Sequence, residues 1–83
     1  MNYLFTFVNT HQAIHAEDVF EAHIPIRVMP LPSQLGDACG ICLRVADKDL
    51  AQAKALLAEA AIETAAIYEI DTTHSKKVYT KCC

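Results

Sequence analysis

The sequence contains little glycine, little proline and no long apolar run. Two glycines and three prolines among 83 residues, with 53% apolar and 20% charged residues, are typical of a globular chain and argue against disorder. The length corresponds to one domain, near the size at which one core barely suffices and pairing with a second copy often helps. The apolar stretch 3–8 is too short for a bilayer and follows no basic leader, so we expect a cytoplasmic protein without a membrane partner.

Basic residues are also scarce. Seven Lys and Arg stand against ten Asp and Glu, which gives a net charge of -3. A phosphate backbone requires a basic stripe, commonly interleaved with aromatic residues, and the sequence contains no such stripe. Nucleic acid is therefore not expected as a partner.

Hydrophobic periodicity predicts four strands and two helices. The strands are expected at residues 3–9, 26–31, 39–45 and 64–71, and the helices at residues 11–23 and 47–62. Asn9 or Thr10 would cap the first helix, and Asp47 the second. The order β-α-β-β-α-β predicts an α+β fold of the ferredoxin-like kind, a four-stranded antiparallel sheet with both helices on one face.

The predicted third strand has two different faces. The period of two places Ile41, Leu43 and Val45 on one face and Cys42 and Arg44 on the other. We expect the face with Arg44 to be the wetter one.

No apolar period continues after Asp71. Residues 72–83 are polar, contain three lysines and end in Cys82-Cys83. We therefore expect one domain at residues 1–71, followed by a mobile tail without a helix or strand.

The four cysteines are the residues most suited to chemistry. Cys39 and Cys42 flank Gly40-Ile41 where the third strand begins. A disulfide scaffold needs a secretory context, which the sequence does not show, so we expect thiols. Residues three apart on a strand lie roughly 10 Å from each other, beyond the ~7 Å Cα limit for a bridge. A Cys39–Cys42 disulfide would need a turn, and thioredoxin-like cycling is the weaker interpretation.

Several motifs together resemble a known family. They are Thr10-His11-Gln12-Ala13, Ile24-Pro25-Ile26-Arg27, Met29-Pro30-Leu31-Pro32 and Cys39-Gly40-Ile41-Cys42-Leu43-Arg44. Over residues 3–71 the chain resembles the small bacterial proteins called "putative Se/S carrier protein-like", a domain long of unknown function. The family usually has an arginine where this chain has Ser33, and a small residue where it has Cys42.

The resemblance implies a thiol carrier of sulfur or selenium rather than an enzyme. Cys39 matches the family's Cys-Gly step and would be the acceptor, holding a persulfide or selenopersulfide. Cys42, or the pair Cys82-Cys83, would then resolve or relay the cargo. The expected partner is a cysteine desulfurase or another sulfur- or selenium-transfer protein, and no cofactor is expected.

Other residues are expected to support the thiolate or a bound anion. Gly40 has no side chain to block approach to the thiol, and a nearby cation lowers a thiol pKa. Arg27, Arg44 and His11 are the candidates for this support.

Two alternatives stay open from the residues alone. Cysteine is among the most buried residue types, so Cys39 and Cys42 are also interpreted as packing residues of a binding or dimerisation module, whose uncovered sheet face would meet a second copy. The four cysteines have the right number for a zinc site, but Cys82 and Cys83 are adjacent rather than two residues apart, and His11 and His15 lack a third ligand. No metal is expected.

Overall fold

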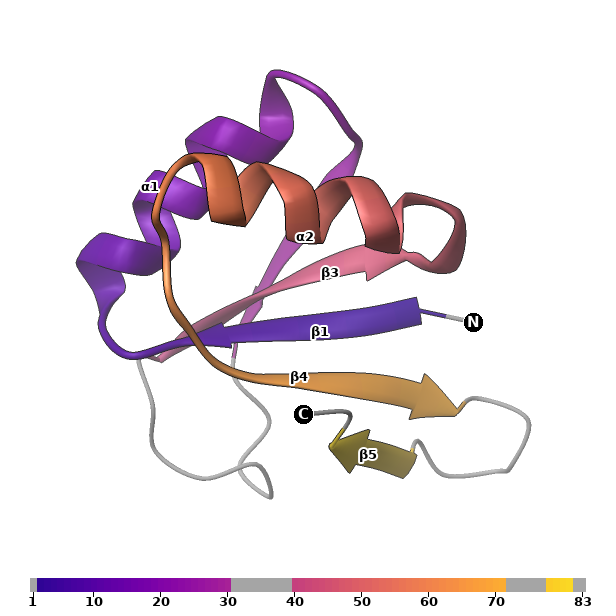
Figure 1. The fold of residues 1–83 in the computed structure, drawn as a ribbon. Coiled ribbons are helices and arrows are strands. Elements are labelled where there is room, and N and C mark those ends of the chain that lie inside the picture. The colour runs from indigo at the N-terminus through magenta and orange to yellow at the C-terminus, as the bar shows by residue number, and fades with distance from the viewer. Residues whose placement is uncertain (1, 31–39, 72–77, 82–83) are drawn as a thin grey trace.

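The part of the chain that the structure describes forms five strands and two α-helices, in an α+β arrangement. The computed structural model describes residues 2–30, 40–71 and 78–81. The elements are β1 (Asn2–Phe7), α1 (Thr10–Glu21), β2 (Ile26–Pro30), β3 (Ile41–Ala46), the short 3-10 helix η2 (Asp47–Asp49), α2 (Leu50–Glu59), β4 (Thr64–Asp71) and β5 (Val78–Lys81). All strand pairs are antiparallel, and the order across the sheet is β2-β3-β1-β4-β5 (Figure 1).

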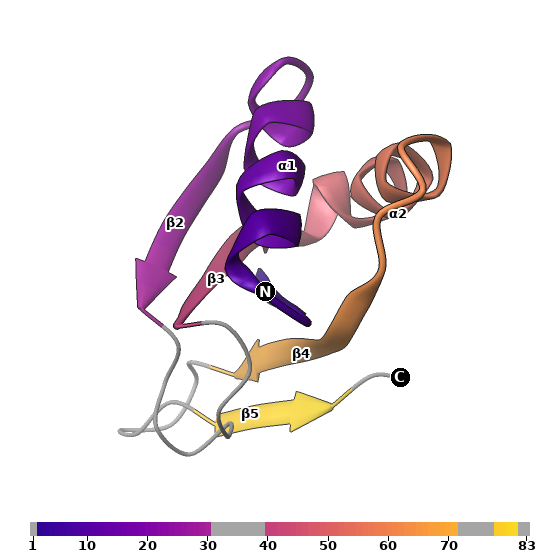
Figure 2. The same ribbon diagram turned by 90° about the vertical axis from the view of Figure 1, so that its left-hand side faces the viewer.

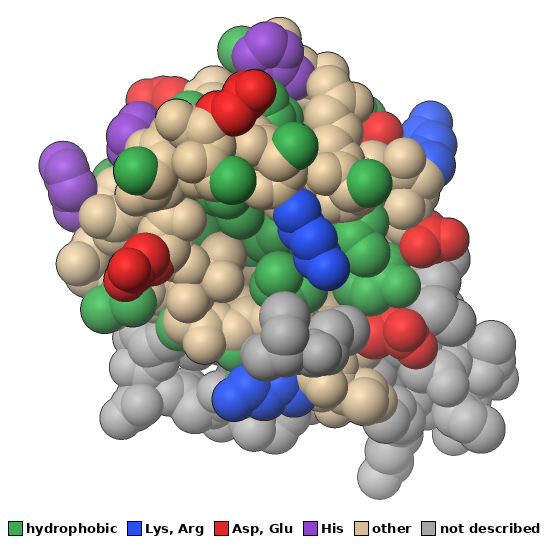
Figure 3. Space-filling model, viewed as in Figure 1, with side chains coloured by type: hydrophobic (Ala, Val, Ile, Leu, Met, Phe, Trp, Pro, Cys, Tyr) green, Lys and Arg blue, Asp and Glu red, His purple; other side chains and the backbone are tan. Residues whose placement is uncertain are grey.

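Both helices cover the same face of the sheet, as Figure 2 shows. The main core lies between the layers, where Phe5, Phe7, Leu43, Val45 and Ile67 of the sheet meet Ala13, Ala16 and Phe20 of α1 and Ala53, Leu56 and Leu57 of α2. The rings of Phe5 and Phe20 meet edge to face with centroids 5.7 Å apart. Such a pair adds about 0.5–1.5 kcal/mol to the burial of its surface. The three histidines in the described part of the chain are exposed, and Figure 3 shows histidines on the outside of the helical layer.

The first helix begins where the sequence predicts. Asn9 is its N-cap, and its side-chain oxygen accepts a hydrogen bond from the backbone N–H of Gln12 at 2.9 Å. The helix ends at Glu21, two residues before the predicted end. The backbone N–H groups of His23 and Ile24 both donate to the carbonyl of Phe20, at 2.9 and 2.7 Å. This tight turn ends the helix before the chain reaches Pro25.

The second helix begins later than predicted. Asp47 opens η2 rather than capping α2, and Asp49 is the N-cap residue without a side-chain capping bond. The residues of α2 that are buried against the sheet are Ala53, Leu56 and Leu57.

The end of α2 has a Schellman geometry built on alanine. Ala61 has a positive φ of 56°. The N–H of Ile62 donates to the Leu57 carbonyl at 3.0 Å, and that of Ala61 to the Ala58 carbonyl at 3.2 Å. Glycine usually occupies this left-handed position because it has no Cβ to clash. An L-residue here is therefore a local strain that the fold tolerates.

The expectation that no helix or strand follows Asp71 was wrong. β5 pairs with β4, with Ile70 opposite Tyr79 and Tyr68 opposite Lys81. The run Val78-Tyr79-Thr80 is β-branched and aromatic, which favours a strand, and the unpaired edge of β4 offers it backbone partners. Residues 72–77 and 82–83 of the predicted tail lie outside the described residues.

The sheet face away from the helices holds a second buried cluster. Leu4, Cys42 and Ile70 are at most 2% exposed, with Met29, Tyr68 and Tyr79 packed against them. The predicted separation of the third strand's faces is confirmed, because Leu43 and Val45 belong to the main core and Cys42 does not. The second face is not simply the wetter one, since Leu4, Cys42 and Ile70 on it are buried. In the described ranges, no helix has the length and hydropathy to cross a membrane.

Candidate functional site

The candidate thiol site begins where the chain enters β3. Cys39, the predicted acceptor, lies outside the described residues, as do Cys82 and Cys83. The next residue, Gly40, is exposed, and a Cβ placed on it would meet no atom within 4 Å. Packing does not demand glycine here, and its small size leaves the backbone open to an approaching molecule.

Cys42 occupies a very different position. Its side chain is fully buried, and its Sγ donates to the carbonyl oxygen of Pro30 at 3.8 Å. In the sheet it is opposite Met29 on β2 and Thr6 on β1. This environment favours the packing interpretation, because a fully buried thiol can meet a visiting molecule only if the residues packed around it move apart. Its role as a relay stays a prediction.

The start of β3 and the start of α1 lie at the same end of the sheet, where β1 ends. Thr6, near the end of β1, is opposite Cys42, near the start of β3, and the chain passes from β1 directly into α1 (Figure 1). The first turn of α1, which is the positive end of the helix dipole, therefore lies at this end of the sheet. The exposed His11 stands in that turn.

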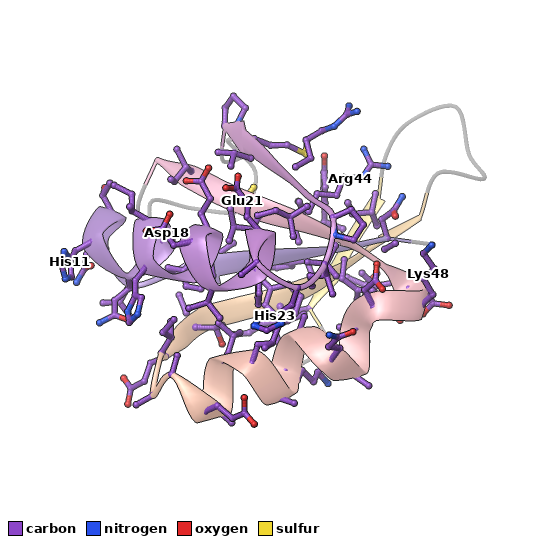
Figure 4. The ribbon with its side chains drawn as sticks, turned by 90° about the horizontal axis from the view of Figure 1, so that it is seen from above. His11, Asp18, Glu21, His23, Arg44 and Lys48 are labelled. Atoms are coloured by element: carbon purple, nitrogen blue, oxygen red, sulfur yellow. The ribbon has the colours of Figure 1, made fainter. Side chains whose placement is uncertain are left out.

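The two arginines lie elsewhere on the sheet. Arg27 of β2 is directly opposite Arg44 of β3. Arg44 is two residues beyond Cys42 and four beyond Gly40, or about 13 Å along the strand from Gly40. Figure 4 shows His11 and Arg44 well apart when the molecule is viewed from above. The predicted supporting residues thus form two groups. Gly40 and His11 lie at one end of the sheet, and the two arginines lie farther along β2 and β3.

Both arginines line a hollow of about 380 Å³. Its lining residues are Asn2, Pro25, Ile26, Arg27, Arg44 and Ala46. Asn2 was not expected to be part of any site. Only the register of β1 on β3, which places Asn2 opposite Ala46, brings it to this hollow.

A second hollow lies on α1 and includes His11 and His15, the histidine pair considered for metal binding. It measures about 370 Å³ and is lined by His11, Ile14, His15 and Asp18. Among the residues that the structure describes, no three His, Cys, Asp or Glu side chains are grouped to hold a metal ion. The predicted four-cysteine alternative involves three cysteines outside the described ranges.

A known protein family matches the part of the chain that runs from β1 into β4. The family described as "Putative Se/S carrier protein-like" matches residues 2–69. The chain belongs to this family. The resemblance carried by the motifs of α1, β2 and β3 is thereby confirmed, and the Cys39-Gly40 step lies within the matched range of this Se/S carrier-like chain. Comparison with curated proteins and with solved structures found no match.

Proposed function

We propose that this Se/S carrier-like protein carries a sulfur or selenium atom on the thiol of Cys39. The observation that carries the proposal is the family match over residues 2–69, which includes the Cys39-Gly40 step. A carrier fits a small domain because the chain needs to supply only one nucleophile and access to it. The reducing cytoplasm, where thiols persist, is the proposed compartment.

The transfer chemistry needs no external oxidant. The Cys39 thiolate attacks the terminal sulfur of a donor persulfide R–S–SH, a new S–S bond forms at Cys39, and the donor's S–S bond breaks to release R–S⁻. The terminal sulfur brings its oxidation state with it, so electrons balance. An acceptor thiolate removes the cargo by the same exchange, and a selenium atom in place of the terminal sulfur would follow the same path.

Two features at the entry of β3 support such a thiolate. Gly40 is exposed and leaves space around the backbone that follows Cys39. The first turn of α1 is at the same end of the sheet and carries a positive partial charge, which favours a thiolate over a thiol. His11, which is proposed to support the thiolate, lies at this end of the sheet, whereas Arg44 lies about 13 Å along the strand from Gly40.

We also propose that residues 2–71 form a ferredoxin-like unit. The order β2-β3-β1-β4, with both helices on one face, supports this assignment. β5 would then be an addition at the edge of β4. Because this fold supports many unrelated functions, the assignment does not by itself carry the proposed carrier role.

Sulfur loading tests the proposal directly. The reduced protein is incubated with a cysteine desulfurase and cysteine, and intact mass is measured under non-reducing conditions. We expect the mass to rise by one sulfur atom in the native sequence and in Cys42→Ala, and not in Cys39→Ala. A double Cys82→Ala, Cys83→Ala variant that still accepts sulfur but no longer passes it on would assign relay to the terminal pair.

Two outcomes would contradict the carrier assignment. One is unchanged loading of Cys39→Ala. The other is a Cys39 that resists iodoacetamide in the native protein and reacts only after denaturation, because a working acceptor has to be reachable.

A further inference from the structure

The sheet register places two like charges in direct opposition. The chain contains two arginines, and Arg27 on β2 is the direct partner of Arg44 on β3. Directly opposite residues of an antiparallel pair have Cβ atoms about 5 Å apart and point to the same face. Like charges in such a pair repel each other unless something negative lies between them.

No carboxylate compensates this pair within the described ranges. Neither guanidinium has an ion-pair partner in residues 2–30, 40–71 and 78–81. The chain as a whole is acidic, with ten acidic residues and a net charge of -3, so this pair is a local concentration of positive charge. Arg44 is half-buried and Arg27 exposed, and both line the hollow of about 380 Å³.

We propose that Arg27 and Arg44 bind a small dianionic oxyanion of the phosphate class in this hollow. Each guanidinium presents a planar fork of N–H donors that matches two oxygens of a tetrahedral anion. A dianion neutralises both cations, whereas a single carboxylate leaves one uncompensated. Asn2, on the hollow's wall, adds an amide N–H donor within the same lining.

This oxyanion site is separate from the thiol site. Arg44 lies about 13 Å along β3 from Gly40, more than the ~8 Å screening length at physiological salt. The arginines therefore act on what binds between them more than on a thiolate at the start of the strand. The inference rests on the register and the hollow, and it holds whether or not Cys39 carries sulfur.

Phosphate titration followed by NMR tests the inference. Sodium phosphate is added to the ¹⁵N-labelled protein at constant ionic strength, with sodium chloride as the balancing salt. We expect saturable shifts in the backbone amides of residues 27 and 44 and in the arginine side-chain N–H signals. Arg44→Gln and Arg27→Gln should each weaken phosphate binding about tenfold, the loss expected when charge-assisted hydrogen bonds are removed.

The matched control removes a positive charge elsewhere. Lys54→Gln changes an exposed cation on α2 and should leave the phosphate affinity unchanged. Equal weakening by Lys54→Gln, or shifts that chloride reproduces at the same ionic strength, would overturn the proposal. If Arg44→Gln fails to fold, Arg27→Gln at its exposed position supplies the same comparison, and unchanged binding there would also refute the paired site.

Discussion

Replacing Cys42 by alanine separates packing from chemistry at the one cysteine that the structure describes. Cys42 is fully buried beside Leu4 and Ile70, and its Sγ donates to the Pro30 carbonyl at 3.8 Å. If the side chain serves packing, its removal will cost stability and leave sulfur loading intact. If it serves as an obligatory relay, its removal will stop the passage of sulfur onward from Cys39.

The expected loss of stability is about 1.5 kcal/mol. Removing one buried atom of this size forfeits about 0.8 kcal/mol of transfer free energy, and the space left behind adds a cavity cost of similar size. For a domain of this length, such a change lowers Tm by roughly 6–12 °C. Cys42→Ser should be worse than Cys42→Ala, because its hydroxyl is buried and its shorter C–O bond moves the donor away from Pro30.

Thermal unfolding by circular dichroism, sulfur loading by intact mass and passage of the loaded sulfur to an added acceptor thiol are measured on the same samples. Cys39→Ala is the matched control, since it makes the same chemical change at the proposed acceptor. We expect the two variants to show opposite results: Cys42→Ala lowers Tm and keeps loading, while Cys39→Ala keeps Tm and loses loading. A Tm for Cys42→Ala within about 2 °C of the unaltered protein would refute the packing argument.

Two further predictions concern the ends of α2 and of the sheet. Ala61→Gly should stabilise the protein by about 0.5–1 kcal/mol in urea unfolding, because Ala61 has a φ of 56°, whereas Ala58→Gly inside the same helix should cost about 1 kcal/mol. Equal destabilisation by both would contradict the left-handed cap. Tyr79→Ala should cost about 1–2 kcal/mol because Tyr79 packs against the buried second cluster, while the exposed Lys81→Ala should change stability by less than about 0.5 kcal/mol. Equal stability of these two variants would argue that β5 contributes nothing to the fold.

Much of the fold could be predicted because its signals are local. The limits of β4 agree with the prediction, Asn9 caps α1, and the two faces of β3 follow its alternation. Local signals were weaker at helix ends. The 3-10 turn at Asp47–Asp49 and the early end of α1 depend on backbone hydrogen bonds that apolar spacing does not reveal.

The strand β5 and the candidate sites depend on partners distant in the sequence. Four residues after a polar stretch carry too short a pattern to predict a strand, and β5 is stabilised by the edge of β4. Alternation shows that Arg44 points away from Val45 but not what stands opposite it. The pairing of Arg27 with Arg44 and the enclosure of Cys42 could therefore not be predicted without the register.

The sequence by itself determined the α+β class, most element positions and the family, because periodicity, capping and motifs are properties of neighbouring residues. Tertiary structure alone decided that Cys42 is enclosed, that the two arginines stand opposite each other and how far they stand from the start of β3. The physical reason is that a strand's pattern specifies its faces, whereas its partner and register come from non-local packing of the whole sheet.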